Sequence, residues 1–119
     1  FAGEYPDGSL GNSHGLFIAS STVHGLATFD PWCVILDLRE LQYRWGNTLL
    51  MVFDYIERFM GSDEGEPSFP VVVVTSEKCR SSFLSLVTPM GQQRPPWHFE
   101  NMDSALDYAV QRANEWIHT

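Results

Sequence analysis

A buried strand followed by an amphipathic helix, within residues 32–60, constrains the fold of this chain more than any other stretch. Residues 33–38 form a nearly continuous apolar run, which is typical of a strand covered on both faces. After a polar loop the apolar spacing becomes helical, with one face formed by Leu49, Val52, Phe53, Ile56 and Phe59. The stretch therefore predicts a strand, a loop and a helix, the repeating unit of an α/β domain.

The same alternation continues toward the carboxyl terminus. Residues 71–74 are four valines after Pro70, and they predict a second buried strand. Thr75 or Ser76 is a cap for the helix that follows, and residues 97–99 predict a short edge strand. Asn101 caps a last helix, whose predicted inward stripe consists of Met102, Leu106, Ala109, Val110, Ala113 and Ile117.

The amino-terminal part has weaker signals. Residues 1–15 hold several glycines and one proline with little apolar periodicity, which predicts a loosely ordered segment. Residues 16–19 predict a short strand, and residues 20–22 predict the start of a short helix that ends near Ala27. We therefore predict one small α/β domain over residues 16–119, with a central, mainly parallel sheet flanked by helices.

Charge and composition narrow the classes of partner. The 119 residues carry a formal net charge of −8, which would repel a phosphate backbone, so nucleic acid is not an expected partner. The longest apolar run, residues 69–74, is far shorter than the ~20 residues that cross a bilayer, and no membrane association is expected. Two cysteines in presumed core positions favour a reduced, cytoplasmic protein.

The loop at residues 39–48 is the first candidate site, because open α/β domains place ligands and partners where strands end and helices begin. A helix start near Asn47 would present unpaired N–H groups and a partial positive charge to an anion or an acidic loop. In the alternative interpretation, Asn47 is only a cap and Trp45 packs over the helix end. The candidate residues are Arg39, Arg44, Trp45, Gly46, Asn47, Thr48, Leu50 and Met51.

The start of the next helix repeats this geometry. Ser76 and Lys78 are candidates for binding the same anion, although the glycine-rich cradle of a nucleotide phosphate loop is missing. An ordinary capped helix start is the alternative.

No pattern of catalytic or metal-binding residues accompanies these candidates. Cys79 lies beside Lys78 and Arg80, yet its phase with Phe83 predicts a buried thiol. The four histidines lie in separate segments without metal-ligand spacing, so neither a metal nor a cofactor is expected. The sequence therefore favours a protein that is not an enzyme.

The order of elements from Leu16 to Trp116 resembles a STAS domain, the fold of bacterial anti-anti-sigma factors and of the cytoplasmic tails of sulfate transporters. The resemblance rests on the strand Val34-Ile35-Leu36-Asp37-Leu38, the following helix over residues 49–59, and the Phe99–Leu106 entry to the last helix. It implies that the turn and helix at residues 44–60 dock a protein partner. The family's phosphorylatable serine is missing, since Thr48 is the only hydroxyl residue of the turn and is displaced by one or two positions.

Two functions follow from these observations. The first is a non-enzymatic regulatory domain that binds a protein partner through residues 44–60. The second is a sensor that binds a small anion, a nucleotide or an acyl ligand at the helix starts of Asn47 and Ser76.

Overall fold

Parallel strands form the middle layer of the fold in the computed structural model, which describes residues 1–43, 47–61, 69–88 and 95–117. One sheet has the strand order β2-β4-β5, and a second pair joins β1 to β3. β3 follows β2 after only Leu38 and Arg39, so consecutive strands of the chain belong to different sheets. The strands are β1 (Ala2–Glu4), β2 (Val34–Asp37), β3 (Glu40–Gln42), β4 (Val71–Val74) and β5 (His98–Phe99).

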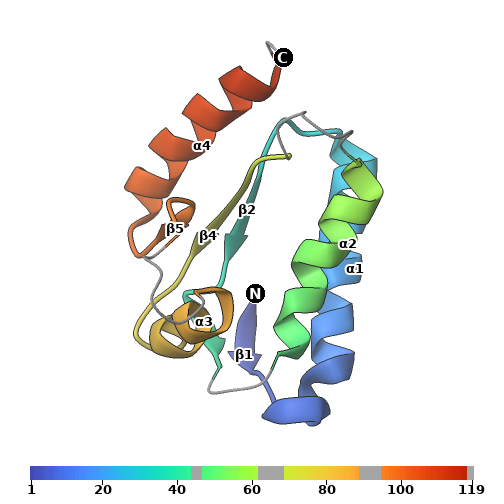
Figure 1. Ribbon diagram of the computed structural model, residues 1–119, viewed down its shortest axis with the longest axis vertical. Coiled ribbons are helices and arrows are strands. Elements are labelled where there is room, and N and C mark those ends of the chain that lie inside the picture. Colours follow the sequence, from blue (N-terminus) through green and yellow to red (C-terminus); the bar gives the residue numbers. More distant parts are fainter. Residues whose placement is uncertain (44–46, 62–68, 89–94, 118–119) are drawn as a thin grey trace.

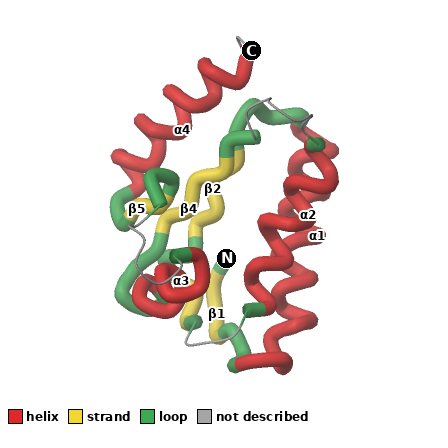
Figure 2. The backbone as a smooth tube through the Cα atoms, viewed as in Figure 1, coloured by secondary structure: helices red, strands yellow, loops and turns green. Residues whose placement is uncertain are grey.

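Helices cover both faces of this layer. In Figure 1, α1 and α2 lie side by side on one side of the sheet and α4 lies on the other, while α3 lies near the carboxyl ends of the strands. Figure 2 shows the same three layers by secondary structure. The α-helices are α1 (Asn12–Phe29), α2 (Met51–Met60), α3 (Arg80–Val87) and α4 (Met102–Ile117), and two 3-10 helices, η1 (Gly8–Gly11) and η2 (Thr48–Leu50), precede α1 and α2. The predicted α/β domain with a parallel sheet flanked by helices is confirmed.

The alternation of side chains along β4 builds two hydrophobic cores. Val73 is buried in the core on the side of α1 and α2. Val72 and Val74 point to the opposite face, where they pack with Ala105 and Ala109 of α4. Because both faces of β4 are covered, this short strand can consist entirely of valine.

The first helix differs from the sequence-based expectation. Residues 16–19 are not a strand, and the helix does not begin at Ser20, because α1 runs unbroken from Asn12 to Phe29. Its buried positions, Gly15, Ile18, Ala19, Thr22 and Leu26, still follow a helical period. The pattern was hard to see because glycine and threonine hold positions that are usually occupied by large apolar residues.

Residues 1–15 also differ from the loosely ordered segment that we predicted. They form β1, η1 and the first turn of α1. Tyr5 is almost completely buried, and its N–H donates to the carbonyl of Gln42, which extends the pairing of β1 with β3.

The inward stripe of α4 is rotated from the predicted one. Ala109 is buried as predicted and Ala105 is buried as well, whereas Leu106, Val110 and Ile117 are exposed. Small side chains allow the helix backbone to approach the valines of β4 closely, and the larger residues turn outward. The predicted inward face of residues 49–59 holds for Leu49 in η2 and for Val52 and Ile56 in α2, but Phe59 is 47% exposed.

Candidate functional site

The charged residues predicted near the end of β2 form local ion pairs. Arg39 donates from Nε and Nη2 to the two carboxylate oxygens of Asp37, at 2.9 and 2.7 Å. These hydrogen bonds lower the pKa of Asp37 and raise that of Arg39. The guanidinium charge is therefore compensated within the turn, and less of it is available to an incoming anion.

Ser76 and Lys78 also bind neighbouring groups of the protein. The Ser76 hydroxyl donates to the carbonyl oxygen of Arg39 at 2.6 Å, which ties the turn after β4 to the turn after β2. Lys78 Nζ lies 2.9 Å from the Glu40 carboxylate. The structure thus brings Arg39, Ser76 and Lys78 together, as a set of paired groups.

A polar hollow of about 560 Å³ lies at the carboxyl ends of β1 and β3. Its charged lining residues are Glu4, Asp7 and Lys78, so carboxylates outnumber ammonium groups. A hollow with this balance of charge repels anions. The anion-sensor hypothesis therefore gains no support from this edge of the sheet.

The turn before α2 is partly described. Arg44, Trp45 and Gly46 lie outside the described residues. Asn47 is exposed and forms no side-chain capping hydrogen bond, although its carbonyl accepts the N–H of Leu50. The predicted cap is therefore a backbone turn, and the side chain of Asn47 is accessible to a partner.

The remaining residues of this turn divide into buried and accessible groups. The Thr48 hydroxyl is hydrogen-bonded to the Tyr5 hydroxyl at 2.7 Å, so it is held inside the fold. Met51 packs partly against the core, whereas Leu50 is 40% exposed. Asn47 and Leu50 are thus the described residues of the predicted docking turn that face solvent.

The chemically reactive side chains near the carboxyl end of β4 are buried. His98 Nε2 lies 2.7 Å from the Thr75 hydroxyl, and the imidazole stacks on Phe83. The Cys79 thiol donates to the carbonyl of Leu38, and burial raises its pKa, which disfavours the nucleophilic thiolate. These groups stabilise the core. Over the described ranges, no three His, Cys, Asp or Glu side chains are grouped to hold a metal ion.

The outer face of α1 is a feature that the sequence analysis missed. We define this face by the exposed residues Ser13, Phe17, Ser20, His24 and Thr28, which recur at helical spacing. Phe17 is 65% exposed and packs edge-on against Phe1. Further exposed apolar residues are Phe29, the last residue of the helix, and Leu10 and Trp32, which lie before and after it in the sequence.

The most unusual property of α1 is its lack of charge. Its 18 residues include no Asp, Glu, Lys or Arg, in a chain with a net charge of −8. The exposed surface of α2, by contrast, carries Asp54, Glu57 and Arg58. The signal was visible in the sequence as an uninterrupted run without charged residues at 12–29, but our prediction divided this run among a loosely ordered segment, a short strand and a short helix.

Comparisons of this chain with protein-family models, with curated proteins and with solved structures find no match. Among the helices that the structure describes, none is long and apolar enough to span a bilayer.

Proposed function

We propose that this chain is a non-enzymatic regulatory domain that binds a protein partner through the outer face of α1. The observation that carries the proposal is the neutral, 18-residue helix that exposes Phe17 between hydroxyl and imidazole side chains. Protein interfaces are depleted of charge at their centre and enriched in aromatic residues, which act as anchors in pockets of the partner.

The docking turn inferred from the STAS resemblance contacts the inner, buried side of α1, opposite this face. η2 packs against α1, and an added Cβ at Gly15 would lie 2.8 Å from the carbonyl oxygen of Thr48. The proposal keeps the STAS-like docking function and moves its centre from the 44–60 turn to α1.

The partner that fits this face is a different protein with a neutral, apolar contact surface. Contacts with α1 would form mainly by apolar burial and by hydrogen bonds, since the helix carries no Asp, Glu, Lys or Arg. Two copies of the chain, each with a net charge of −8, repel one another, which favours a neutral partner over a second copy. The two free cysteines agree with a cytoplasmic location, where thiols stay reduced.

The test compares two Phe→Asp variants on two helices. Candidate partners are captured from the source cells, purified, and titrated against the wild type, Phe17→Asp and the control Phe59→Asp, whose Phe is 47% exposed on α2. We expect F17D to weaken binding by about tenfold or more, as for an interface anchor, and F59D to leave it unchanged. We also expect little change in affinity between about 0.05 M and about 0.5 M salt.

Three results would overturn the proposal. Retained affinity in F17D would show that the partner binds elsewhere, and a strong salt dependence would show that charge pairs dominate the interface. A concentration-dependent dimer of the wild type in sedimentation experiments, abolished by F17D, would replace the different protein with a second copy.

A further inference from the structure

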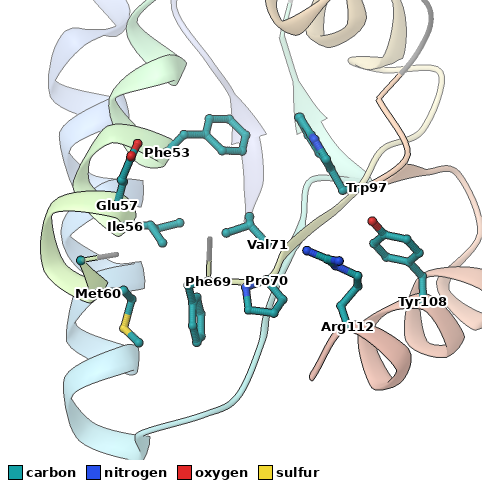
Figure 3. A pocket seen from close by; sticks show the side chains of 11 residues that line it. Phe53, Ile56, Glu57, Met60, Phe69, Pro70, Val71, Trp97, Tyr108 and Arg112 are labelled. Atoms are coloured by element: carbon teal, nitrogen blue, oxygen red, sulfur yellow. The ribbon is translucent and has the colours of Figure 1, made fainter. Parts of the chain in front are cut away.

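A second surface of the molecule contains a cavity that the proposed docking function does not use. It has a volume of about 250 Å³ and lies between the end of α2, the start of β4 and α4. Figure 3 shows the side chains that surround it. Most of its wall is apolar and is formed by Phe53, Ile56, Met60, Phe69 and Trp97.

The cavity lies beside the first half of β4, because β5 pairs only with the second half of that strand. Val73 and Thr75 donate their N–H groups to the carbonyls of Trp97 and Phe99, and pairing with β5 covers only Val73 and Val74. Backbone groups alternate along a strand, so the N–H of Val71 points to the same edge of β4, before the pairing with β5 begins. A backbone donor thus borders the apolar wall.

Arg112 supplies the positive charge of the cavity. In Figure 3 its guanidinium group extends from α4 toward Val71, and the Tyr108 hydroxyl points to the same region. The Arg112 side chain is about two-thirds covered, with 35% exposed, and its Nη1 donates to Glu115 at 2.7 Å. A guanidinium has five N–H donors, so the donors that do not bind Glu115 are left for a ligand, although Glu115 compensates part of the charge.

We propose that this cavity binds a small monocarboxylate with an aromatic or short aliphatic body. The carboxylate pairs with Arg112, and the body lies against Trp97 and Phe53. The planar guanidinium matches a carboxylate in geometry, and apolar walls strengthen the pairing by excluding water.

The volume sets the size of the ligand. A dry cavity of ~150 Å³ accommodates benzene, so about 250 Å³ corresponds to roughly ten non-hydrogen atoms. A nucleotide or a long acyl chain exceeds this size. Glu57 lies on the opposite wall of the cavity and is exposed, so its carboxylate favours a ligand whose own carboxylate binds on the Arg112 side.

The test uses 3-phenylpropionate and its neutral isostere, 3-phenylpropanamide, in calorimetric titrations of the whole chain. We expect the acid to bind tenfold to a hundredfold more tightly than the amide, because a charge-assisted hydrogen bond is lost in the amide. Arg112→Gln should remove this preference while leaving the affinity for the amide unchanged. The matched control Arg58→Gln removes an exposed α2 arginine that pairs with Asp54 outside the cavity, and it should preserve the preference.

A second variant tests the location even if R112Q fails to fold. Met60→Trp places a larger apolar side chain in the wall and should abolish binding of both compounds. Absence of binding at millimolar concentration, equal affinities for acid and amide, or binding that survives M60W would each overturn the proposal. Tighter binding of L-phenylalanine than of 3-phenylpropionate would also overturn it, because an ammonium group would then pair with Glu57. None of these results depends on Phe17, so this site and the docking face are tested separately.

Discussion

The hydroxyl groups of Tyr5 and Thr48 lie 2.7 Å apart and share a hydrogen bond that joins the segment after β1 to the first residue of η2. Glycine allows α1 to pack over this pair. An added Cβ at Gly15 would lie 2.7 Å from the Tyr5 hydroxyl oxygen and 2.8 Å from the Thr48 carbonyl oxygen. The position of α1, and hence of its outer face, depends on this close approach.

Gly15→Ala is therefore expected to destabilise the protein, although alanine is the better helix former. The new methyl group must displace a backbone carbonyl, and such overpacking costs about 1–3 kcal/mol in the free energy of unfolding. Urea unfolding followed by circular dichroism measures the change.

Gly25→Ala is the matched control in the same helix. An added Cβ at Gly25 meets no heavy atom within 4 Å, so the substitution should raise the free energy of unfolding by about 0.5–1 kcal/mol. Opposite signs for the two substitutions support the packing of α1 against Thr48. Equal stabilisation by both would contradict it.

The hydrogen bond itself can be measured with a double-mutant cycle of Tyr5→Phe and Thr48→Val. We expect a coupling free energy of about 0.5–1.5 kcal/mol, because the two hydroxyls are partners inside the fold. A cycle that pairs Tyr5→Phe with Thr28→Val, at an exposed position of α1, should be additive. If the first cycle is also additive, the two hydroxyls do not interact in solution.

The elements that sequence reasoning predicted well have dense and regular apolar patterns. β2 and β4 lie within the predicted runs, and Asn101 caps α4 by accepting the N–H of Ser104. These elements were predictable because local composition and burial agree in them.

The start of the chain was predicted poorly because its structure depends on distant partners. β1 pairs with β3, about 38 residues away in the sequence, and Tyr5 reaches Thr48, 43 residues away. The sequence indicated that the turns after β2 and β4 share one end of the sheet, and Ser76 does bind the carbonyl of Arg39 there, whereas the outer face of α1 was not predicted. The ion pairs of Arg39 with Asp37 and of Lys78 with Glu40 were not predictable, because charge pairing depends on side-chain geometry rather than on spacing.

Tyr43 makes stability sensitive to alkaline pH. Burial, and to a smaller extent the neighbouring Tyr5, raises the pKa of Tyr43 from 10.0 to about 12. The folded protein therefore holds this proton more tightly than the unfolded chain, so the stabilisation is complete below pH 10 and is lost as the pH rises to about 12. Unfolding by urea at a series of pH values should show a falling free energy of unfolding across this window.

Tyr43→Phe should make the free energy of unfolding less dependent on pH in the same window, because the side chain no longer titrates. Tyr5 contributes in the same direction, since burial raises its pKa as well, so part of the slope should remain. Tyr55→Phe, at a half-buried position of α2, is the control for the removal of a tyrosine hydroxyl at another position. An unchanged slope in Y43F would show that Tyr43 does not carry the effect.

Cys79 should behave as a core residue in labelling experiments. Its side chain is 2% exposed, its thiol donates to the carbonyl of Leu38 at 3.3 Å, and burial raises its pKa. A thiol reagent reaches such a group only after local or global opening, so labelling in a Cys33→Ala background should be at least ~10³-fold slower than in the unfolded chain. The half-buried Cys33, measured in a Cys79→Ala background, should react at an intermediate rate. Fast labelling of Cys79 in the folded protein would contradict the buried position and would restore a nucleophile to a chain that we propose is not an enzyme.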